Sequence, residues 1–424
     1  MNRMILFCII SAAYGLFAPS AKAQEIGLDL RATLEKAQLE YGPLLALKQT
    51  EFTAQGIIQK ATVLPNPELA FSWEDFLSSE TTGLQYGKYN LELQMPIEWG
   101  GKRSARERSA LAEADLALLE AEKQKAELFV EVSNAFLNLK EKDALKDLAK
   151  QRLRLASTLA DIATQKLRAG KLSGVEQSRL SSLAALAEIE LGERELNAKN
   201  ASQRAASYIG ISNMSSEEFI FPFEMIPEVA NLGEELSQTW AARIASAQSQ
   251  KSLADVTLAS KEAIPNLTLK AGTVFDWSTE ETVFSIGFSL PLPLFDRNQG
   301  GQLLAQALND SNSARAKSIQ PELKRELSEV LNSLEFSRTK ALHLKNEILP
   351  KLRESATLLA EAYERGRVTY LELVETQESL FSIEEKYLET LSQFHQAVFR
   401  LAFSNQVNEG LVKIASLYSV EAKK

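Results

Sequence analysis

The side chains in this chain that could do chemistry are carboxylates in helical surroundings. Glu372 and Glu375 are three residues apart, so an α-helix would place both on one face, a turn or two beyond Gly366. In a single chain such a pair is typical of a solvated helix face. In a trimer, six carboxylates would ring one opening, which would favour cations and oppose anions. The pair therefore indicates a constriction only if the protein is an oligomer.

No catalytic arrangement accompanies these carboxylates. The two histidines, His343 and His395, occupy unrelated helical positions, and the sequence has no His-x-x-x-His, Gly-x-Ser-x-Gly or P-loop spacing. His395 continues a seven-residue series that begins at Val374, which favours a coiled-coil contact over a ligand role. The only cysteine, Cys8, lies in a segment that we expect to be removed. The sequence predicts no enzyme, no cofactor and no metal site.

Two short breaks in long helical stretches are the other candidate for function. They span residues 168–174 and 365–369. Turn chemistry accounts for their composition, because a glycine with positive φ can end one helix and a hydroxyl side chain can cap the next. These residues are Gly170 with Ser173 in the first break, and Gly366 with Thr369 in the second. Equivalent turns at the far ends of long rods would also be accessible to a partner protein.

The N-terminus predicts export from the cytoplasm. A short basic start, an apolar run over residues 5–17 and a small-x-small site at Ala21 to Ala23 indicate that residues 1–23 are a signal peptide. The run is shorter than the ~20 residues that a membrane-spanning helix needs. The chain is acidic, with a formal net charge of −9, and has no basic block, so no nucleic-acid partner is expected. If the mature protein enters a membrane, it must do so by strands.

Four stretches of about 10 residues alternate apolar with polar side chains, which is the length of a tilted membrane-crossing strand. They predict β-hairpins at 68–96 and 266–292, and Pro96, Pro291 and Pro293 mark strand ends because proline cannot donate to a sheet ladder. A half-buried soluble sheet shows the same alternation. Four strands cannot close a barrel, and lipid tolerates no unpaired backbone. Either the sheet is soluble, or several chains share one barrel, and three chains would supply twelve strands.

Long helices follow each hairpin. Residues 102–210 contain no proline and are rich in strong helix formers, and a rod of that length must pack on a returning helix to bury its apolar stripe. The outgoing helix of the second half should bend at its prolines, Pro321 and Pro350. The expected helices cover residues 29–60 with Asp29 as N-cap, 104–167, 175–208, 302–364 and 370–403.

These patterns divide the chain into two similar halves. Each half has a helix, a β-hairpin and a helical hairpin. The expected divisions are a first repeat over 24–210, with its helical hairpin at 102–210, a linker over 211–233, a second repeat over 234–407, with its helical hairpin at 300–405, and a loosely structured tail over 408–424.

The same order of elements resembles a known family. A helix, Pro65-Asn-Pro67, a hairpin, the segment Pro-x-Glu-x-Gly-Gly-Lys-Arg at 96–103 and the duplicated long helices resemble the TolC-type outer membrane efflux proteins. The segment Pro-Leu-Pro-Leu-Phe-Asp-Arg-Asn-Gln-Gly at 291–300 resembles their CzcC-like branch, which serves heavy-metal cation exporters. The resemblance covers essentially the whole mature chain.

The resemblance implies a mainly α fold with a membrane β-barrel contribution. It implies a homotrimer in the outer membrane, with a twelve-stranded barrel in the lipid and a tunnel of antiparallel coiled-coil helices in the periplasm. The partners would be a periplasmic adaptor protein and an inner-membrane pump of the resistance-nodulation-division (RND) type. The chain would be a passive duct, because the pump would supply the energy.

The resemblance also implies roles for particular residues. The family's turn pattern, glycine with Ser or Thr three residues later and an acid at six, matches Gly170 with Glu176 and Gly366 with Glu372. An aperture built from a tyrosine and an acidic pair would fall on Tyr363, Glu372 and Glu375. Some family members have an arginine where this chain has Val368. The residues expected to dock the adaptor are Arg168, Gly170, Ser173, Arg365, Gly366 and Thr369.

Two alternatives remain at the level of sequence. Within the family, the duct could serve drug efflux or type I protein secretion, and only the partner pump distinguishes these. Outside it, the chain could be a soluble periplasmic coiled-coil scaffold, which would account for the helices but leave the strands without a purpose.

Overall fold

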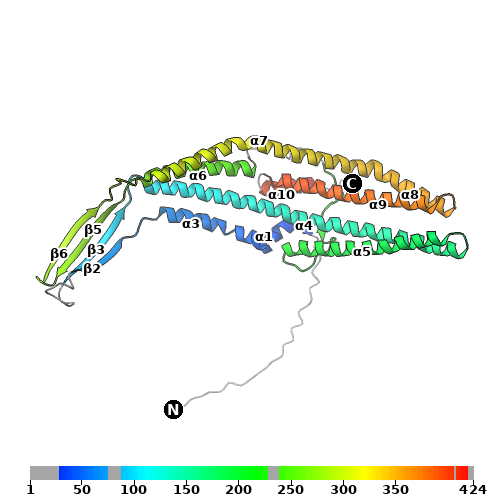
Figure 1. The fold of residues 1–424 in the computed structure, drawn as a ribbon, viewed down its shortest axis with the longest axis horizontal. Helices are drawn as coiled ribbons and strands as arrows, with labels where there is room; N and C mark the ends of the chain where they lie inside the picture. The colour runs from blue at the N-terminus through cyan, green and yellow to red at the C-terminus, as the bar shows by residue number, and fades with distance from the viewer. Residues whose placement is uncertain (1–27, 75–86, 228–237, 405–406, 419–424) are drawn as a thin grey trace, which may run out of the picture.

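The computed structural model describes residues 28–74, 87–227, 238–404 and 407–418. The expected signal peptide and the polar connection at 78–83 lie outside these ranges. Long helices run side by side along most of the molecule, with a sheet at one end and two helical turns at the other (Figure 1). The described part contains no helix that is both long enough and apolar enough to cross a membrane.

The two predicted hairpins meet in one antiparallel sheet. Its order is β2 (Glu68–Glu74), β3 (Lys88–Ile97), β5 (Leu267–Asp276) and β6 (Glu281–Ser289). The central strands β3 and β5 pair from Lys88 opposite Asp276 to Ile97 opposite Leu267. Alternation therefore predicted all four strands, and the pairing between the two halves brings β2 and β6 to the edges.

The register collects apolar side chains on one face of this sheet. Leu69 lies opposite Leu93, and Leu269 lies opposite Phe288. This face is uncovered, since Phe288 is 74% exposed. The other face is polar: the Lys270 ammonium lies 3.3 Å from a Glu92 carboxylate oxygen. The chain alone therefore leaves a large apolar surface in contact with solvent, which marks an interaction site.

The first helical hairpin follows β3. Helix α4 (Lys102–Arg168) has 67 residues, which at 1.5 Å per residue gives a rod of about 100 Å. Helix α5 (Gly174–Tyr208) returns along it (Figure 1). Both agree closely with the expected helices, because both are free of proline and rich in strong helix formers.

The second helical hairpin has an interrupted outgoing arm. Helix α7 (Gln299–His343) continues through Pro321 and curves (Figure 1), then a five-residue π-helical turn (Leu344–Ile348) precedes α8 (Leu349–Glu364). Pro350 has no backbone N–H and its ring clashes with the carbonyl four residues earlier, which accounts for the widened turn just before it. The single helix predicted over 302–364 is therefore divided. Helix α9 (Tyr370–Ala402) returns as expected.

The single helix predicted over 29–60 is also wrong. The structure has α1 (Leu30–Glu40), α2 (Gly42–Leu47) and α3 (Thr50–Thr62). Pro43 explains the first break, because it cannot supply an intrahelical hydrogen bond. The predicted N-cap is confirmed: Asp29 accepts a hydrogen bond of 2.7 Å from the Ala32 N–H. Helix α6 (Trp240–Glu262) is the corresponding element before the second hairpin and packs on α4 and α7.

The linker and the C-terminus close the core near the middle of the rods. The short strands β1 (Leu28–Asp29) and β4 (Phe219–Ile220) pair in parallel, and α10 (Val407–Tyr418) packs on α9. The prediction of a loosely structured tail over 408–424 is wrong for its described part, up to Tyr418, because that part is helical, Ile414 is buried and Leu411 packs against the core. The pairing of β1 with β4 was not predicted, since two-residue strands leave no periodic signal.

His395 is buried at this level of α9. Its Nδ1 lies 2.6 Å from the Tyr418 hydroxyl, and its Nε2 lies 2.8 Å from the Phe223 carbonyl oxygen. The expected buried contact is therefore present, but its partners come from the linker and the C-terminal helix and not from a coiled-coil seam.

Candidate functional site

The two helical turns at the end opposite the sheet have the same backbone conformation. Gly170 has a φ of +70° and Gly366 a φ of +69°, as predicted. The Lys171 N–H donates to the Lys166 carbonyl at 2.8 Å, and the Arg367 N–H makes the equivalent bond five residues back at 2.9 Å. This pattern satisfies the last carbonyls of the outgoing helix. Each turn is therefore a defined surface feature.

Reciprocal caps begin the returning helices. The Ser173 hydroxyl accepts from the Glu176 N–H at 3.2 Å, and the Ser173 N–H donates to the Glu176 carboxylate at 3.0 Å. Thr369 and Glu372 repeat the arrangement, with the Thr369 N–H 3.0 Å from the carboxylate. The predicted caps are confirmed. Hydrogen bonds from the backbone and side chain of Ser173 lower the pKa of the Glu176 carboxyl group.

The six residues expected to dock an adaptor are all exposed. Arg365 forms an ion pair within its own chain, since its Nη2 lies 3.4 Å from a Glu361 carboxylate oxygen. Val368, where some relatives have arginine, packs against the apolar cluster between the hairpins. The exposed residues are Arg168, Gly170, Ser173, Arg365, Gly366 and Thr369. Both turns lie at the same end of the molecule (Figure 1).

The three residues expected at the aperture do not share one surface. Glu372 and Glu375 are exposed on the first turns of α9, as the three-residue spacing predicted. Tyr363 is only 6% exposed and packs between the hairpins with Leu180 and Leu373. Its ring lies 3.9 Å below the Lys166 ammonium. Tyr363 therefore joins the two turns and does not line a free surface with the glutamates.

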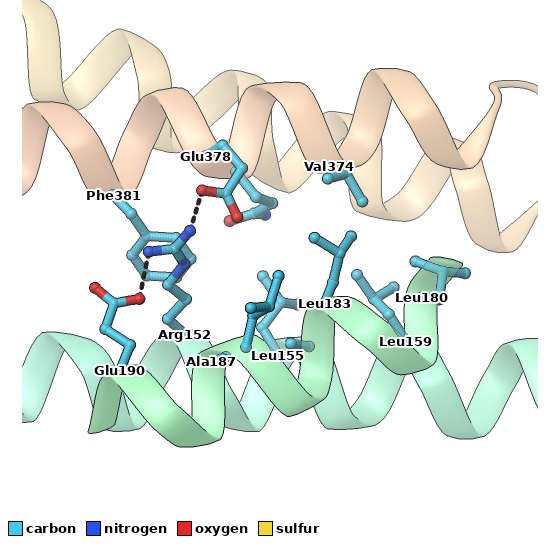
Figure 2. A pocket seen from close by; sticks show the side chains of 13 residues that line it. Arg152, Leu155, Leu159, Leu180, Leu183, Ala187, Glu190, Val374, Glu378 and Phe381 are labelled. Atoms are coloured by element: carbon cyan, nitrogen blue, oxygen red, sulfur yellow. Dashed lines mark hydrogen bonds and ion pairs between the residues drawn. The ribbon is translucent and has the colours of Figure 1, made fainter. Parts of the chain in front are cut away.

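A charged bridge joins the two helical hairpins further from the turns (Figure 2). Arg152 of α4 donates to Glu190 of α5 at 2.5 Å and also to Glu378 of α9. Arg194 of α5 donates to Glu385 of α9 at 2.5 Å. Leucines from α4 and α5 face Val374 and Phe381 beside the bridge, around a cavity of about 80 Å³.

No sequence pattern indicated this bridge. Glu378 lies 226 residues from Arg152, and these helices contain many charged side chains at helical spacing, so no local pattern selects the pair. Burial lowers the pKa of Arg152, but the hydrogen bond to Glu378 and the charges of Glu378, Glu190 and Glu385 outweigh it and leave the pKa above its ordinary value. The guanidinium is thus a permanent positive charge between acidic helices.

Arg152→Gln should loosen the contact between the hairpins. The bridge is partly exposed, so we expect a loss of only about 1 kcal/mol, but Glu378 then lacks the cation that joins α9 to α4. Spin labels at Ser178 and Leu371 should report a broader distance distribution between α5 and α9. Arg154→Gln removes the same charge from an exposed position two residues away and should leave the distribution unchanged. Equal broadening in both variants would exclude a specific role for the bridge.

Metal ligands do not gather in the part of the chain that the structure describes. None of its residues form a cluster of three or more His, Cys, Asp or Glu side chains that could hold an ion. The arrangement at the turns can bind a protein surface or bias ions by charge.

The geometry of the rods, sheet and turns agrees with the comparisons to known proteins. The profile of the family described as "Outer membrane efflux protein" matches residues 43–210 and 234–404. The chain belongs to the outer membrane efflux protein family. This confirms the resemblance seen in the sequence and assigns the chain to the outer membrane as an efflux duct, not an enzyme. It overturns the alternative of a soluble periplasmic scaffold.

Individual members of the outer membrane efflux protein family are similar over most of the chain. The "Cobalt-zinc-cadmium resistance protein CzcC" of Cupriavidus metallidurans is 30% identical over 83% of this chain and 83% of its own length. The "Pyoverdine export outer membrane protein OpmQ" of Pseudomonas putida is 24% identical over 76% of this chain and 71% of its own. The crystal structure of VceC from Vibrio cholerae has a TM-score of 0.72 at 18% identity, over 90% of this chain and 95% of that chain, which shows a common fold.

Proposed function

We propose that this protein is the outer membrane duct of a tripartite system that exports heavy-metal cations. The proposal that heavy-metal cations are the exported substrate rests on the 30% identity to CzcC, a cobalt-zinc-cadmium resistance protein, over 83% of the chain. The CzcC-like segment at 291–300 supports the same branch. The protein itself needs no metal site, because selection belongs to the pump and the duct only has to let hydrated cations pass.

The proposed working form is a homotrimer. The strands β2 and β6 are the edges of the described sheet, and their outer backbone groups would be unpaired in lipid. Pairing β6 of one copy with β2 of the next satisfies these groups, and three copies give a closed sheet of twelve strands. The uncovered apolar face then contacts lipid, and the polar face with Glu92 and Lys270 lines the interior.

We propose that the chain consists of two structural repeats, 24–210 and 234–407, joined by the linker 211–233. The family profile matches two segments with a gap over residues 211–233, which supports this division. The two turns with their identical caps then become equivalent sites around a pseudo-six-fold ring of helical hairpins in the trimer. Such a ring would extend through the periplasm to meet the adaptor, and the adaptor would join it to an inner-membrane RND pump.

The two exposed glutamates of α9 form the proposed constriction. Glu372 closes a cap at the turn, and Glu375 lies three residues further along the same face. A ring of six carboxylates at the trimer axis would hold water and cations in the resting state. Tyr363, which is buried, would support this opening from behind and not line it.

Replacing Glu375 by glutamine should raise single-channel conductance in a planar bilayer and weaken the block by multivalent cations. Glu375 is the better target because its carboxylate is absent from the cap that Glu372 closes. The double variant with Glu372→Gln should have the larger effect. Glu354→Gln removes an exposed acid from α8, further from the turn, and serves as a control. Unchanged conductance and block in the double variant would rule out the acidic constriction.

Cargo can be tested in the host cell. Deleting the gene should lower tolerance to cobalt, zinc and cadmium several-fold, and a plasmid copy should restore it. The similarity to OpmQ, a pyoverdine export protein, makes pyoverdine export the second candidate. Loss of pyoverdine secretion with unchanged metal tolerance would favour that candidate over metal export.

A further inference from the structure

The loop between β6 and α7 exposes three large apolar side chains in succession. Leu292 is 72% exposed, Leu294 is 65% exposed and Phe295 is 92% exposed. The loop lies at the end of the sheet from which the helices begin (Figure 1). Neither the sheet nor a helix of the described residues covers these side chains, although their burial would be favourable.

Polar side chains on the following residues hold this loop in shape. The Arg297 Nε donates to the Pro293 carbonyl at 3.2 Å, and the Gln299 side-chain amide donates to the Phe295 carbonyl at 3.0 Å. The Asn298 side-chain amide donates to the Ala259 carbonyl of α6 at 2.8 Å. These hydrogen bonds fix the turn in a conformation that points the three apolar side chains away from the protein.

Two prolines and a tight turn reduce the number of backbone donors in the loop. Pro291 and Pro293 have no N–H group, and the Leu294 N–H donates to the Leu292 carbonyl at 2.8 Å. An unpaired N–H group is costly in hydrocarbon, so irregular backbone is normally kept out of it. Loss of two donors at the prolines and pairing of the Leu294 N–H lower the cost of placing this loop at the boundary of a lipid layer.

The loop continues the apolar face of the sheet. Phe284, Ile286 and Phe288 project from that face of β6, and Leu292 and Leu294 keep the same every-second spacing beyond the end of the strand. In the proposed trimer a neighbouring copy takes the backbone edge of β6, which leaves this face to lipid. Because the loop continues a face that would contact lipid, lipid is favoured over another protein chain as the partner that covers Leu292 and Leu294.

Two further observations mark this level as a lipid–water boundary. Asp296 and Arg297 follow Phe295 directly, so the sequence changes from apolar to charged side chains within one residue. Trp99 lies at the same end of the sheet, is 48% exposed, and donates from its indole nitrogen to the Pro265 carbonyl. Tryptophan with a paired N–H and an exposed ring is typical of membrane interfaces.

We propose that residues 292–295 form an interfacial lipid anchor, in which Leu292, Leu294 and Phe295 insert among phospholipid acyl chains of the periplasmic leaflet. The anchor would fix the depth at which the sheet ends and the helices begin. This inference rests on the proposed placement of the sheet in the membrane, and the experiment must separate the two.

Site-directed spin labelling can do so, because Cys8 is the only cysteine. With Cys8 replaced by serine, a nitroxide is attached to single cysteines at position 295, at 286 on the apolar face of β6, and at 297 in the polar turn. The labelled trimer is reconstituted in phospholipid vesicles, and collision rates are measured with oxygen, which concentrates in the acyl region, and with a water-soluble nickel chelate. We expect oxygen to dominate at 286 and, less strongly, at 295, and nickel to dominate at 297.

The outcomes separate the anchor from the membrane placement. Lipid-like collisions at 286 with nickel-dominated collisions at 295 would overturn the anchor and keep the sheet in the membrane. An immobile label at 295 that neither reagent reaches would assign the loop to a contact with another copy and also overturn the anchor. Nickel-dominated collisions at 286 itself would overturn the membrane placement on which the anchor rests.

Discussion

Ile286→Arg should remove the protein from the outer membrane fraction. Ile286 lies in the middle of β6 on the apolar face and is 93% exposed in the single chain, so in the proposed trimer it contacts lipid. A charged side chain near the bilayer midplane costs about 2–4 kcal/mol, and three copies incur this cost together. We expect loss of the assembled trimer from sedimented outer membranes, with the unassembled chain degraded.

Ser285→Arg is the matched control. Ser285 is the preceding residue of the same strand, points to the polar face, and lies opposite Gly272, which leaves room for a long side chain. The arginine would face the water-filled interior, and assembly should be preserved. If both variants assemble equally well, the apolar face does not contact lipid and the proposed arrangement of the sheet is wrong.

Sequence patterns correctly predicted those strands, turns and helices whose formation depends mainly on neighbouring residues. The period-two alternation located all four strands because the side chains of one face share one environment. Gly170 and Gly366 located the turns because positive φ strongly favours glycine. The proline-free stretch after Lys102 predicted α4 within a few residues of its ends.

The elements that the sequence did not reveal depend on contacts between distant segments. The bridge from Arg152 to Glu378 depends on the packing of two hairpins, and burial of Tyr363 depends on the same packing. Helix α10 has an apolar stripe too short to stand out, and it is stabilised by a core formed by the linker and α9. Pro43 was a local signal that could have divided the first helix. Pro350 predicted a bend in the outgoing helix, but it did not predict the π-helical turn at Leu344–Ile348.

His395→Ala should destabilise the middle of the molecule more than any surface change. His395 has no exposed surface, and its loss leaves a cavity and removes the partners of the Tyr418 hydroxyl and the Phe223 carbonyl. We expect a loss of about 3 kcal/mol or more per chain, with early release of α10. Limited proteolysis of the C-terminus and denaturant unfolding in detergent measure these effects. His343→Ala is the control, since His343 is 55% exposed beside Glu347 and should change stability by less than about 0.5 kcal/mol.

The same histidine makes stability depend on pH. Burial lowers the pKa of His395 from 6.5 to about 4, against an opposing hydrogen bond to the Phe223 carbonyl. Between these values the unfolded chain binds a proton that the folded chain does not, so stability is fully present above pH 6.5 and falls as the pH decreases toward 4. The loss approaches about 3 kcal/mol per chain, which would be a large fraction of the stability of an ordinary domain. In His395→Ala this component of the pH dependence should disappear, and an unchanged slope between pH 4 and 6.5 would assign it to other groups.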